Sequence, residues 1–298
     1  MAYETLLLEK RGKVAVLTLN RPANNAVSYA MLGEFDKALD EIASDRELRV
    51  LVITGSGEKS FCAGMDVADA VNHPDVGPVG RALWTKVDRF EKPVIAAING
   101  HALGGGCELA LACHFRYMAA NDNAKIGCPE LNLGIIPGWG GTQRLTRLLG
   151  RSKALELMLF SKRLSPAEAL AIGLVDGIFP PHELMPKVME MAEELAGRAP
   201  LAVQAVIRSV QAHLDKGMDE GLKVETEQSR ICATSKDAVE GFTAFLQKRK
   251  PEFKGEVQMA NPASSGTAYT MIATLVQLMG EEKAFEYLKA LHPNISTY

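Results

Sequence analysis

Short apolar runs that alternate with helix-like segments are the feature that most limits the folds open to this chain. The runs Val14–Leu19, Val50–Thr54 and Pro93–Ile98 have the length of buried strands and are followed by glycine, proline or asparagine. Between the first two runs, apolar residues recur at helical spacing from Met31 to Ile42. Because strands that alternate with helices usually build a sheet with helices packed on it, the pattern predicts an α/β core.

Helical patterns dominate the chain after residue 150. Ser165 precedes a proline and Glu168 follows, which is typical of the start of a helix. The helices expected in this part are Ser152–Phe160, Pro166–Ile172, Glu183–Arg198, Ala202–Lys216 and Ala238–Lys248.

Composition argues against several classes of protein. The 298 residues are 47% apolar, enough for a full core, and a net charge of −3 is unlike that of a nucleic-acid-binding protein. The five cysteines are scattered, so we expect reduced thiols and neither a disulfide framework nor a metal site. The N-terminus lacks the pattern of a secretion signal, and no apolar run has the length of a membrane span. We therefore expect a cytoplasmic protein that does not bind a membrane.

The segment Asn99–Ala110 carries the clearest indication of chemistry. It runs from a strand through Gly104, Gly105 and Gly106 directly into an apolar helix. Glycines let a ligand approach the backbone, and the first N–H groups of a helix have no partner within it, so this turn can stabilise an anion. The spacing matches neither a Walker A loop nor a dinucleotide fingerprint, which favours a developing oxyanion. The simplest alternative is a tight turn that binds nothing.

Two carboxylates and a second glycine turn accompany this segment. Glu108 falls in the first turn of the helix, and Glu130 follows a proline in a segment rich in glycine and proline. The stretch Ala63–Met65 can supply a second oxyanion donor. Paired carboxylates near an oxyanion site are suited to activating water and moving a proton at carbon. Alternatively, Glu108 only caps its helix and Glu130 is a surface charge.

Together these stretches resemble the crotonase superfamily, and within it the enoyl-CoA hydratases. The resemblance is carried by FCAGMD, KPVIAAINGHALGGGCELALAC and PELNLGIIPGWGGTQRL, in this order, and extends from about residue 3 to residue 255. It implies a superhelix of stacked β-β-α turns with a helical C-terminal region that builds homotrimers, commonly paired into hexamers. It also implies an acyl-CoA thioester as substrate, so coenzyme A arrives with the substrate and no separate cofactor is needed.

The resemblance also assigns roles to single residues. The oxyanion donors fall on the backbone N–H groups of Met65 and Gly105, and the catalytic carboxylates fall on Glu108 and Glu130. The residues implied to contact the substrate or coenzyme A are Ala63, Asp66, Gly138, Phe245 and Lys248, the last two from a neighbouring subunit.

The implied reaction adds water to 2-enoyl-CoA and gives 3-hydroxyacyl-CoA, a step of fatty acid β-oxidation. The two N–H donors stabilise an enolate-like transition state, the glutamates hold water, and a proton reaches the α-carbon through Glu130. Retention of both glutamates favours hydration, while isomerase and hydrolase reactions of the same fold stay open. His114 stands where the family usually carries aspartate, which leaves acyl specificity open. Trp139 either shapes the acyl pocket or is an ordinary core aromatic.

The composition changes after Pro251–Gly255. We therefore expect a crotonase core at 1–200, a helical oligomerisation region at 201–255 and an atypical helical tail at 256–298. The sequence NPASSGTAYT at 261–270 resembles a segment of periplasmic substrate-binding proteins, in which serines and N–H groups at a helix start bind an anion. An anion-binding role for this tail is a second hypothesis, and a fusion of unrelated sequence is another.

Overall fold

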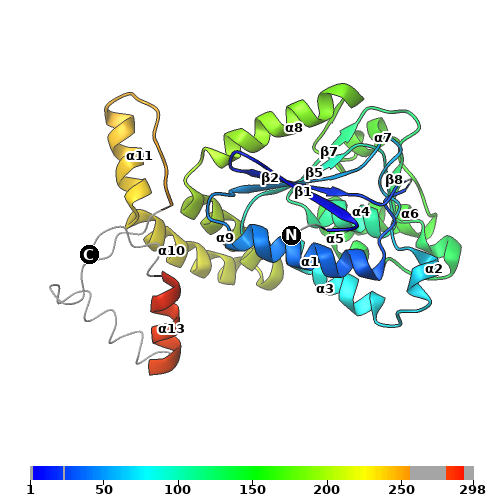
Figure 1. The fold of residues 1–298 in the computed structure, drawn as a ribbon, viewed down its shortest axis with the longest axis horizontal. Coiled ribbons are helices and arrows are strands. Elements are labelled where there is room, and N and C mark those ends of the chain that lie inside the picture. The colour runs from blue at the N-terminus through cyan, green and yellow to red at the C-terminus, as the bar shows by residue number, and fades with distance from the viewer. Residues whose placement is uncertain (1–2, 23, 256–279, 292–298) are drawn as a thin grey trace. The chain divides into compact units, whose positions relative to one another are not determined.

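The computed structural model describes residues 3–22, 24–255 and 280–291. The chain forms two compact units, Met1–Ala196 and Gly197–Tyr298. Figure 1 shows a sheet with its helices in the first unit and helices in the second. The division expected from the sequence, into 1–200, 201–255 and 256–298, stays a prediction. Among the described residues, no helix is both long and apolar enough to cross a membrane.

A six-stranded sheet forms the centre of the first unit, in the order β1-β2-β3-β5-β7-β9. β1 runs antiparallel to β2, and every other neighbouring pair is parallel. The three apolar runs predicted as strands are confirmed as β2, β3 and β5. The strands of this sheet are Leu6–Arg11 (β1), Val14–Leu19 (β2), Val50–Gly55 (β3), Val94–Ile98 (β5), Phe115–Ala119 (β7) and Gly177–Phe179 (β9).

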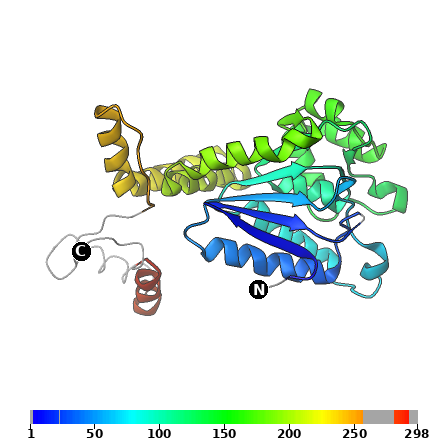
Figure 2. The same cartoon turned by 45° about the horizontal axis from the view of Figure 1, so that its top comes forward.

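Both faces of this sheet are covered, which explains why its strands are continuously apolar rather than alternating. Side chains point alternately to the two faces of a strand. In β3, Val50 and Val52 pack with helix α8 (Pro181–Ala196), whereas Leu51 belongs to the larger core on the other face. Figure 2 shows α8 lying along one face, with helix α1 (Tyr29–Ser44) on the opposite side.

A smaller sheet brings three loops together. Its strands are parallel, in the order β4-β6-β8. Because parallel strands end at the same edge of a sheet, the segments that follow these three strands converge there. The strands and the helices that follow them are β4 (Ser60–Cys62) with α2 (Val67–Ala70), β6 (His101–Leu103) with α4 (Gly105–Ala112), and β8 (Ile126–Gly127) with the 3-10 helix η1 (Glu130–Leu133).

The repeated order of strand, strand and helix agrees with the fold implied by the crotonase resemblance. In the first repeat β3 leads to β4, and in the second β5 leads to β6. The helix start expected at Ser165 is confirmed, and it forms a capping box, since the Ser165 hydroxyl accepts the Glu168 N–H and the Glu168 carboxylate accepts the Ser165 N–H. The other helices of the first unit are α3 (Val76–Asp88), α5 (Gly141–Leu149), α6 (Arg151–Leu159) and α7 (Pro166–Ala171).

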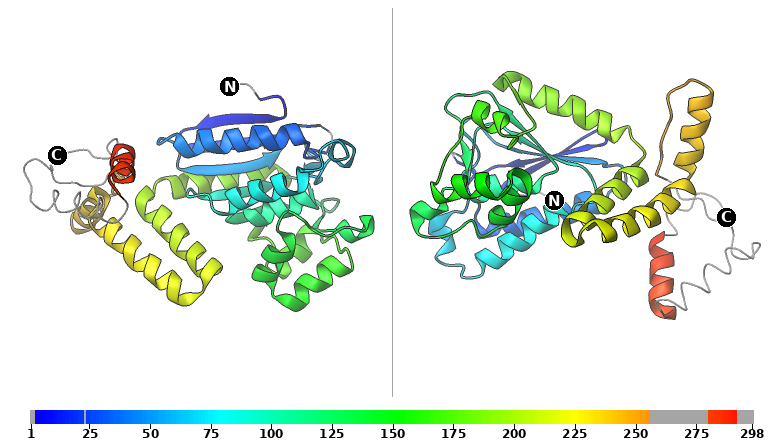
Figure 3. Two further views of the ribbon diagram at one scale, coloured as in Figure 1. Left: turned by 90° about the horizontal axis from the view of Figure 1, so that it is seen from below. Right: turned by 180° about the vertical axis from the view of Figure 1, so that it is seen from behind.

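The second unit is helical, as the sequence pattern predicts. Helix α10 is not among the helices expected from the sequence. It follows α9 directly, and Gly217, with a φ of 88°, is both the C-cap of α9 and the N-cap of α10. Figure 3 shows the two helices joined at this bend. The anion-binding hypothesis concerned residues 261–270, which lie outside the described residues. Among the described residues, the helices of this unit are α9 (Pro200–Lys216), α10 (Met218–Ala233), α11 (Lys236–Leu246) and α13 (Glu281–Leu291).

Candidate active site

The turn between β6 and α4 has a backbone conformation that favours glycine. Gly104 has φ 55° and ψ −127°, and its N–H donates to the Gly127 carbonyl at 3.0 Å. Its own carbonyl accepts the Glu108 N–H at 3.0 Å, which closes the first turn of α4. Because the N–H and C=O of a trans peptide point in opposite directions, the N–H of Gly105 points away from the helix. That N–H is therefore directed toward an acceptor outside α4.

The turn at Gly64, after β4, lies against the start of α4. Gly64 has φ 93°, and a Cβ there would lie 2.7 Å from the Leu103 carbonyl oxygen and 3.1 Å from the Gly105 nitrogen. The lack of a side chain thus brings the Gly64–Met65 peptide close to the Gly105 N–H. In the described part of the chain, neither the Met65 nor the Gly105 N–H donates a backbone hydrogen bond. The two N–H groups predicted as oxyanion donors therefore lie near one another.

Glu108 is buried, with 2% of its surface exposed, and its carboxylate is held by backbone donors. The N–H groups of Trp139 and Gly141 both donate to Oε1, each at 2.8 Å. Burial raises the pKa of Glu108, while these two N–H groups and the charges of Arg144 and Arg81 act in the opposite direction. Glu108 therefore does more than cap its helix: it joins α4 to the loop before α5.

Glu130 begins η1 and is also buried, with 9% of its surface exposed, so its reading as a surface charge is wrong. A Cβ on Gly104 would lie 3.3 Å from Glu130 Oε1, which places this carboxyl beside the turn between β6 and α4. Oε2 has no hydrogen-bond partner among the described residues. Burial raises the pKa of Glu130 to about 7, and the charge of Glu108 adds to this effect. The two carboxyl groups thus interact within one site.

Two tryptophans pack against the turn between β6 and α4. Trp84 of α3 is fully buried, and its Nε1–H donates to the Gly105 carbonyl at 3.0 Å. Its ring meets the Trp139 ring edge to face, with centroids 5.6 Å apart. A Cβ on Gly105 would lie 2.5 Å from Trp139 Cζ3, so this packing requires glycine there. Sequence reasoning gave Trp84 no role, because nothing in its local pattern indicates a contact with Gly105.

Three of the residues expected to contact the substrate lie in loops at this end of the first unit. The Ala63 N–H donates to the Asn24 carbonyl at 3.0 Å. The Asp66 carboxylate pairs with Arg21 at 2.9 Å and caps α2, and these contacts lower its pKa. The Gly138 carbonyl accepts from Arg81 Nε at 3.0 Å. Contact of these three residues with substrate stays a prediction.

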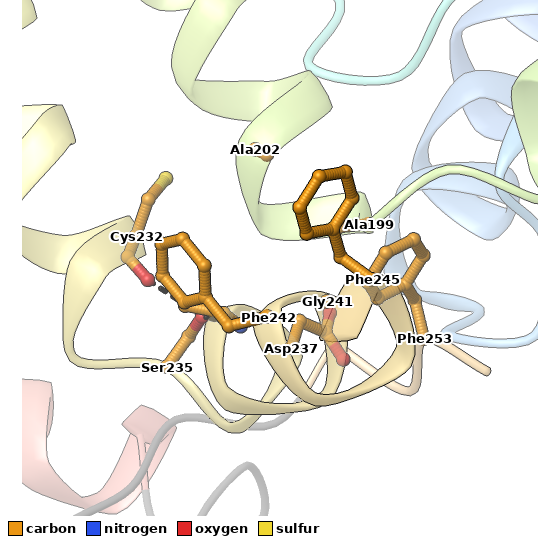
Figure 4. Close-up of a pocket in the computed structure, with 10 residues that line it drawn as sticks. Ala199, Ala202, Cys232, Ser235, Asp237, Gly241, Phe242, Phe245 and Phe253 are labelled. Atoms are coloured by element: carbon orange, nitrogen blue, oxygen red, sulfur yellow. Dashed lines mark hydrogen bonds between the residues drawn. The ribbon is translucent and has the colours of Figure 1, made fainter. Parts of the chain in front are cut away.

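Phe245 and Lys248 belong to the second unit. Phe245 is 81% exposed near the end of α11, and it lines an apolar pocket together with Phe242, Phe253 and Cys232 (Figure 4). Lys248 follows α11 with a positive φ of 54°. Their predicted contact with the coenzyme A of a neighbouring subunit stays a prediction.

His114, the departure from the family pattern, has a packed ring. The ring Nδ1 of His114 accepts the Val94 N–H at 2.9 Å, and the backbone N–H of His114 donates to the Val94 carbonyl at 2.9 Å. Burial lowers the pKa of this imidazole, with Asp88 acting in the opposite direction. His114 therefore ties the end of α4 to β5. In residues 3–22, 24–255 and 280–291 no group of three or more His, Cys, Asp or Glu side chains is arranged to hold a metal ion.

Comparison with known proteins gives consistent matches over most of the chain. A sequence model of the enoyl-CoA hydratase/isomerase family matches residues 9–256. The chain is 42% identical to a crotonyl-CoA hydratase of Syntrophomonas wolfei over 259 residues, which are 85% of this chain and 99% of that protein. It is 39% identical to the 2,3-dehydroadipyl-CoA hydratase of Escherichia coli over 257 residues, or 84% and 98% of the two chains.

A solved structure shows the same fold. The crystal structure of an enoyl-CoA hydratase from Bacillus anthracis matches with a TM-score of 0.81 and 39% identity, covering 85% of this chain and 100% of that one. The family match ends at residue 256, next to the point where the composition of this chain changes.

Proposed function

This chain belongs to the enoyl-CoA hydratase/isomerase family, and from that premise we propose that Glu108 and Glu130 catalyse the addition of water to a 2-enoyl-CoA thioester. Hydration is the activity named for relatives that are about 40% identical over nearly their whole length. The product is a 3-hydroxyacyl-CoA, and the enzyme is a hydro-lyase. The relatives named for crotonyl-CoA and 2,3-dehydroadipyl-CoA differ in acyl group, so the proposal covers the reaction and not one acyl chain.

The observation that carries the residue assignment is the pair of unlike carboxyl groups beside two N–H donors. Glu108 is held by two N–H groups and faces two arginine charges, which favour its ionised form. Glu130 lacks comparable donors, and its pKa near 7 lets it carry a proton at neutral pH. Carboxyl groups whose environments separate their pKa values can act as base and acid in the same reaction.

The reaction then proceeds with each proton accounted for. The thioester carbonyl accepts the N–H groups of Met65 and Gly105, which stabilise negative charge on its oxygen. The Glu108 carboxylate takes a proton from water while the water oxygen bonds to the β-carbon. The electrons of the double bond form an enolate at the thioester, and the Glu130 carboxyl gives its proton to the α-carbon. Transfer of one proton from Glu108 to Glu130 restores the starting state.

Separate Glu108→Gln and Glu130→Gln substitutions test the assignment. Either change should lower kcat for crotonyl-CoA hydration about 10²- to 10⁴-fold, because general acid–base catalysis contributes on this order. The 3-hydroxyacyl-CoA product is measured directly by chromatography, which separates hydration from isomerisation. Glu34→Gln is the matched control, since Glu34 also accepts two N–H groups, those of Glu4 and Thr5, and should retain activity. Two glutamine variants as active as this control would rule out the two-carboxylate mechanism.

We further propose that the protein forms homotrimers, alone or paired as hexamers. Apolar side chains exposed on the surface of each unit support burial in an assembly. In the first unit Leu159 and Phe160 are 58% and 74% exposed, and in the second Phe242 and Phe245 are 72% and 81% exposed. Native mass spectrometry should give a mass of three or six chains, and a monomer at micromolar concentration would contradict the proposal.

A cytoplasmic location and a reaction without a separate cofactor complete the proposal. All five cysteines are free, and four of them are buried, which suits a reducing compartment. Cell fractionation tests the location. Enzyme that is dialysed against EDTA should hydrate crotonyl-CoA as fast as untreated enzyme, because both proton transfers use protein carboxyl groups. Loss of activity that is restored by a metal would contradict this part.

A further inference from the structure

We propose that Arg144 is a positioning residue for Glu108: it fixes the loop whose N–H groups hold the catalytic carboxylate. This inference rests on the proposed function, since it concerns the carboxylate assigned as the base. The loop consists of residues 138–140, which lead into α5, and of Gly141, the first residue of that helix. Two of its N–H groups donate to Glu108 Oε1, so the carboxylate can be no better placed than this loop is.

The loop is held in part by its neighbours, since Arg81 Nε donates to the Gly138 carbonyl and the Trp139 ring packs against Trp84. It has three glycines, and Gly140 has a φ of 110°, a conformation that costs glycine little. Arg144 supports the middle of the loop. Its Nη1 donates to the Trp139 carbonyl at 2.9 Å, and its backbone N–H donates to the Gly140 carbonyl at 2.9 Å. A Cβ on Gly140 would collide with Nη1, so the glycine makes room for the guanidinium.

Arg144 is anchored on its other side by helix α3. Its Nη2 donates to the Trp84 carbonyl at 3.3 Å, and its Nε lies 3.3 Å from Oδ1 of Asp88. The residue is 8% exposed, and hydrogen bonds from a buried guanidinium are charge-assisted. One side chain thus connects α3, α5 and the loop that holds Glu108. Lysine cannot reproduce this fork of contacts, because it has a single nitrogen.

Arg144 also acts on Glu108 through its charge. The charged and titratable groups that face Glu108 are Arg144 from α5, Arg81 from α3, Glu130 from η1 and Cys128 before it. Arg144 and Arg81 lower the pKa of Glu108 against the effect of burial. Loss of Arg144 therefore has two consequences that a purely structural residue would not share: a displaced base, and a base whose pKa is higher.

Arg116 gives a matched control. It is another buried arginine of the first unit, 7% exposed, and it donates to the carbonyls of Leu174 and Cys113 and pairs with Asp176. None of these contacts involves the loop or Glu108. Replacing either arginine by methionine removes a buried charge and keeps most of the apolar volume. Both variants should lose thermal stability, and only one should change the chemistry.

The experiment compares pH profiles of crotonyl-CoA hydration. Arg144→Met should lower kcat about tenfold with KM changed less than twofold, and move the acid limb of kcat/KM to higher pH. In Arg116→Met, kcat and the pH of the acid limb should equal those of the native enzyme. In Arg144→Lys, the acid limb should return to its native pH while kcat stays reduced. If Arg144→Met does not fold, Arg144→Lys alone must show the reduced kcat.

An Arg144→Met profile that coincides with that of Arg116→Met would overturn the inference, as would an Arg144→Lys enzyme with full kcat. Failure of the proposed function would be detected with a different variant. In that case Glu108→Gln in the otherwise native chain would retain hydration, whatever the arginine variants do.

Discussion

At the scale of single residues, Glu108 and Glu130 differ in what surrounds their carboxyl groups. Two N–H groups donate to one oxygen of Glu108, whereas Oε2 of Glu130 has no partner among the described residues. Burial acts on both. Two N–H groups and two nearby arginines favour the charged form of Glu108, whereas only its own backbone N–H does so for Glu130. The same residue type can therefore serve as base at one position and as acid at the other.

The pH dependence of the rate should report the protonation of Glu130. Its pKa of about 7 means that the proton needed at the α-carbon is lost as the pH rises. We expect kcat/KM for crotonyl-CoA to fall above about pH 7, measured by product formation across the pH range. The residual activity of Glu130→Gln should lack this alkaline limb, and the Glu34→Gln control should keep it. An alkaline limb that survives in Glu130→Gln would assign it to another group.

Glu130 should also make stability depend on pH. Its folded pKa of about 7 lies above the usual value of 4.5, so between these pH values the folded state binds more protons than the unfolded state. The free energy of unfolding contributed by this group therefore falls as the pH rises from about 4.5 to about 7. Denaturant titrations should show that the free energy of unfolding of Glu130→Gln, relative to that of the native protein, rises by up to about 3 kcal/mol between pH 4.5 and pH 8. A constant difference would contradict the raised pKa.

Two glycines near the carboxyls should respond differently to alanine. Gly105→Ala forces a Cβ to within 2.5 Å of the Trp139 ring, so both melting temperature and kcat should fall. At Gly138 a Cβ would meet nothing closer than the Ile136 carbonyl at 3.8 Å, so Gly138→Ala should melt like the native protein. If substrate passes over Gly138, as predicted, the KM of this variant should rise several-fold. An unchanged KM would remove Gly138 from the substrate site.

At the scale of elements, the two faces of the large sheet have separate roles. Helix α8 packs on one face through Leu184, Val188 and Ala192, and helix α4, which carries Glu108, belongs to the core on the other. The smaller sheet then brings the segments after β4, β6 and β8 to one edge. This division separates residues that only stabilise the fold from those that position the carboxyls.

A truncation in α8 tests this separation. Leu184 is 1% exposed, and Leu184→Ala should cost about 2–5 kcal/mol of unfolding free energy, the usual range for a buried leucine. Because α8 lies on the face away from α4, kcat at 25 °C should stay within twofold of the native value. Chemical denaturation and product assays on the same preparation give both numbers. A large loss of kcat in folded enzyme would show that α8 also supports the site.

At the scale of the whole molecule, the groups proposed to catalyse hydration lie within the first unit. Glu108, Glu130 and the two N–H donors all belong to residues 1–196. The family match extends through the second unit to residue 256. The last forty or so residues lie beyond the part that relatives share.

Removal of residues 256–298 should therefore leave hydration intact. The truncated chain keeps the bonds that tie its end to α11, in which Asp237 accepts the N–H groups of Lys254 and Gly255. We expect kcat and KM for crotonyl-CoA within twofold of the full chain. A collapse of activity in truncated protein that is still folded would show that the tail contributes to the enzyme.

What the sequence determined by itself was local or carried by contiguous motifs. The strands predicted at Val14–Leu19 and Val50–Thr54, the helix start at Ser165 and the start of α4 after three glycines follow from period, turn residues and capping chemistry. The ordered motifs also indicate the family from the sequence alone. Helix α10 was missed, since its polar pattern gives a weaker periodic signal.

Only the tertiary structure decided how the carboxyls are surrounded. Glu108 receives its N–H donors from residues 31 and 33 positions away, and Glu130 is buried although its neighbours in sequence resemble a surface loop. The support of Arg144 spans α3, α5 and the loop between η1 and α5. Such contacts depend on how distant elements pack, and packing leaves no mark in local residue patterns. The different surroundings of the two carboxyl groups, on which the proposed base and acid roles rest, follow from that packing, so they could not be obtained from the chain alone.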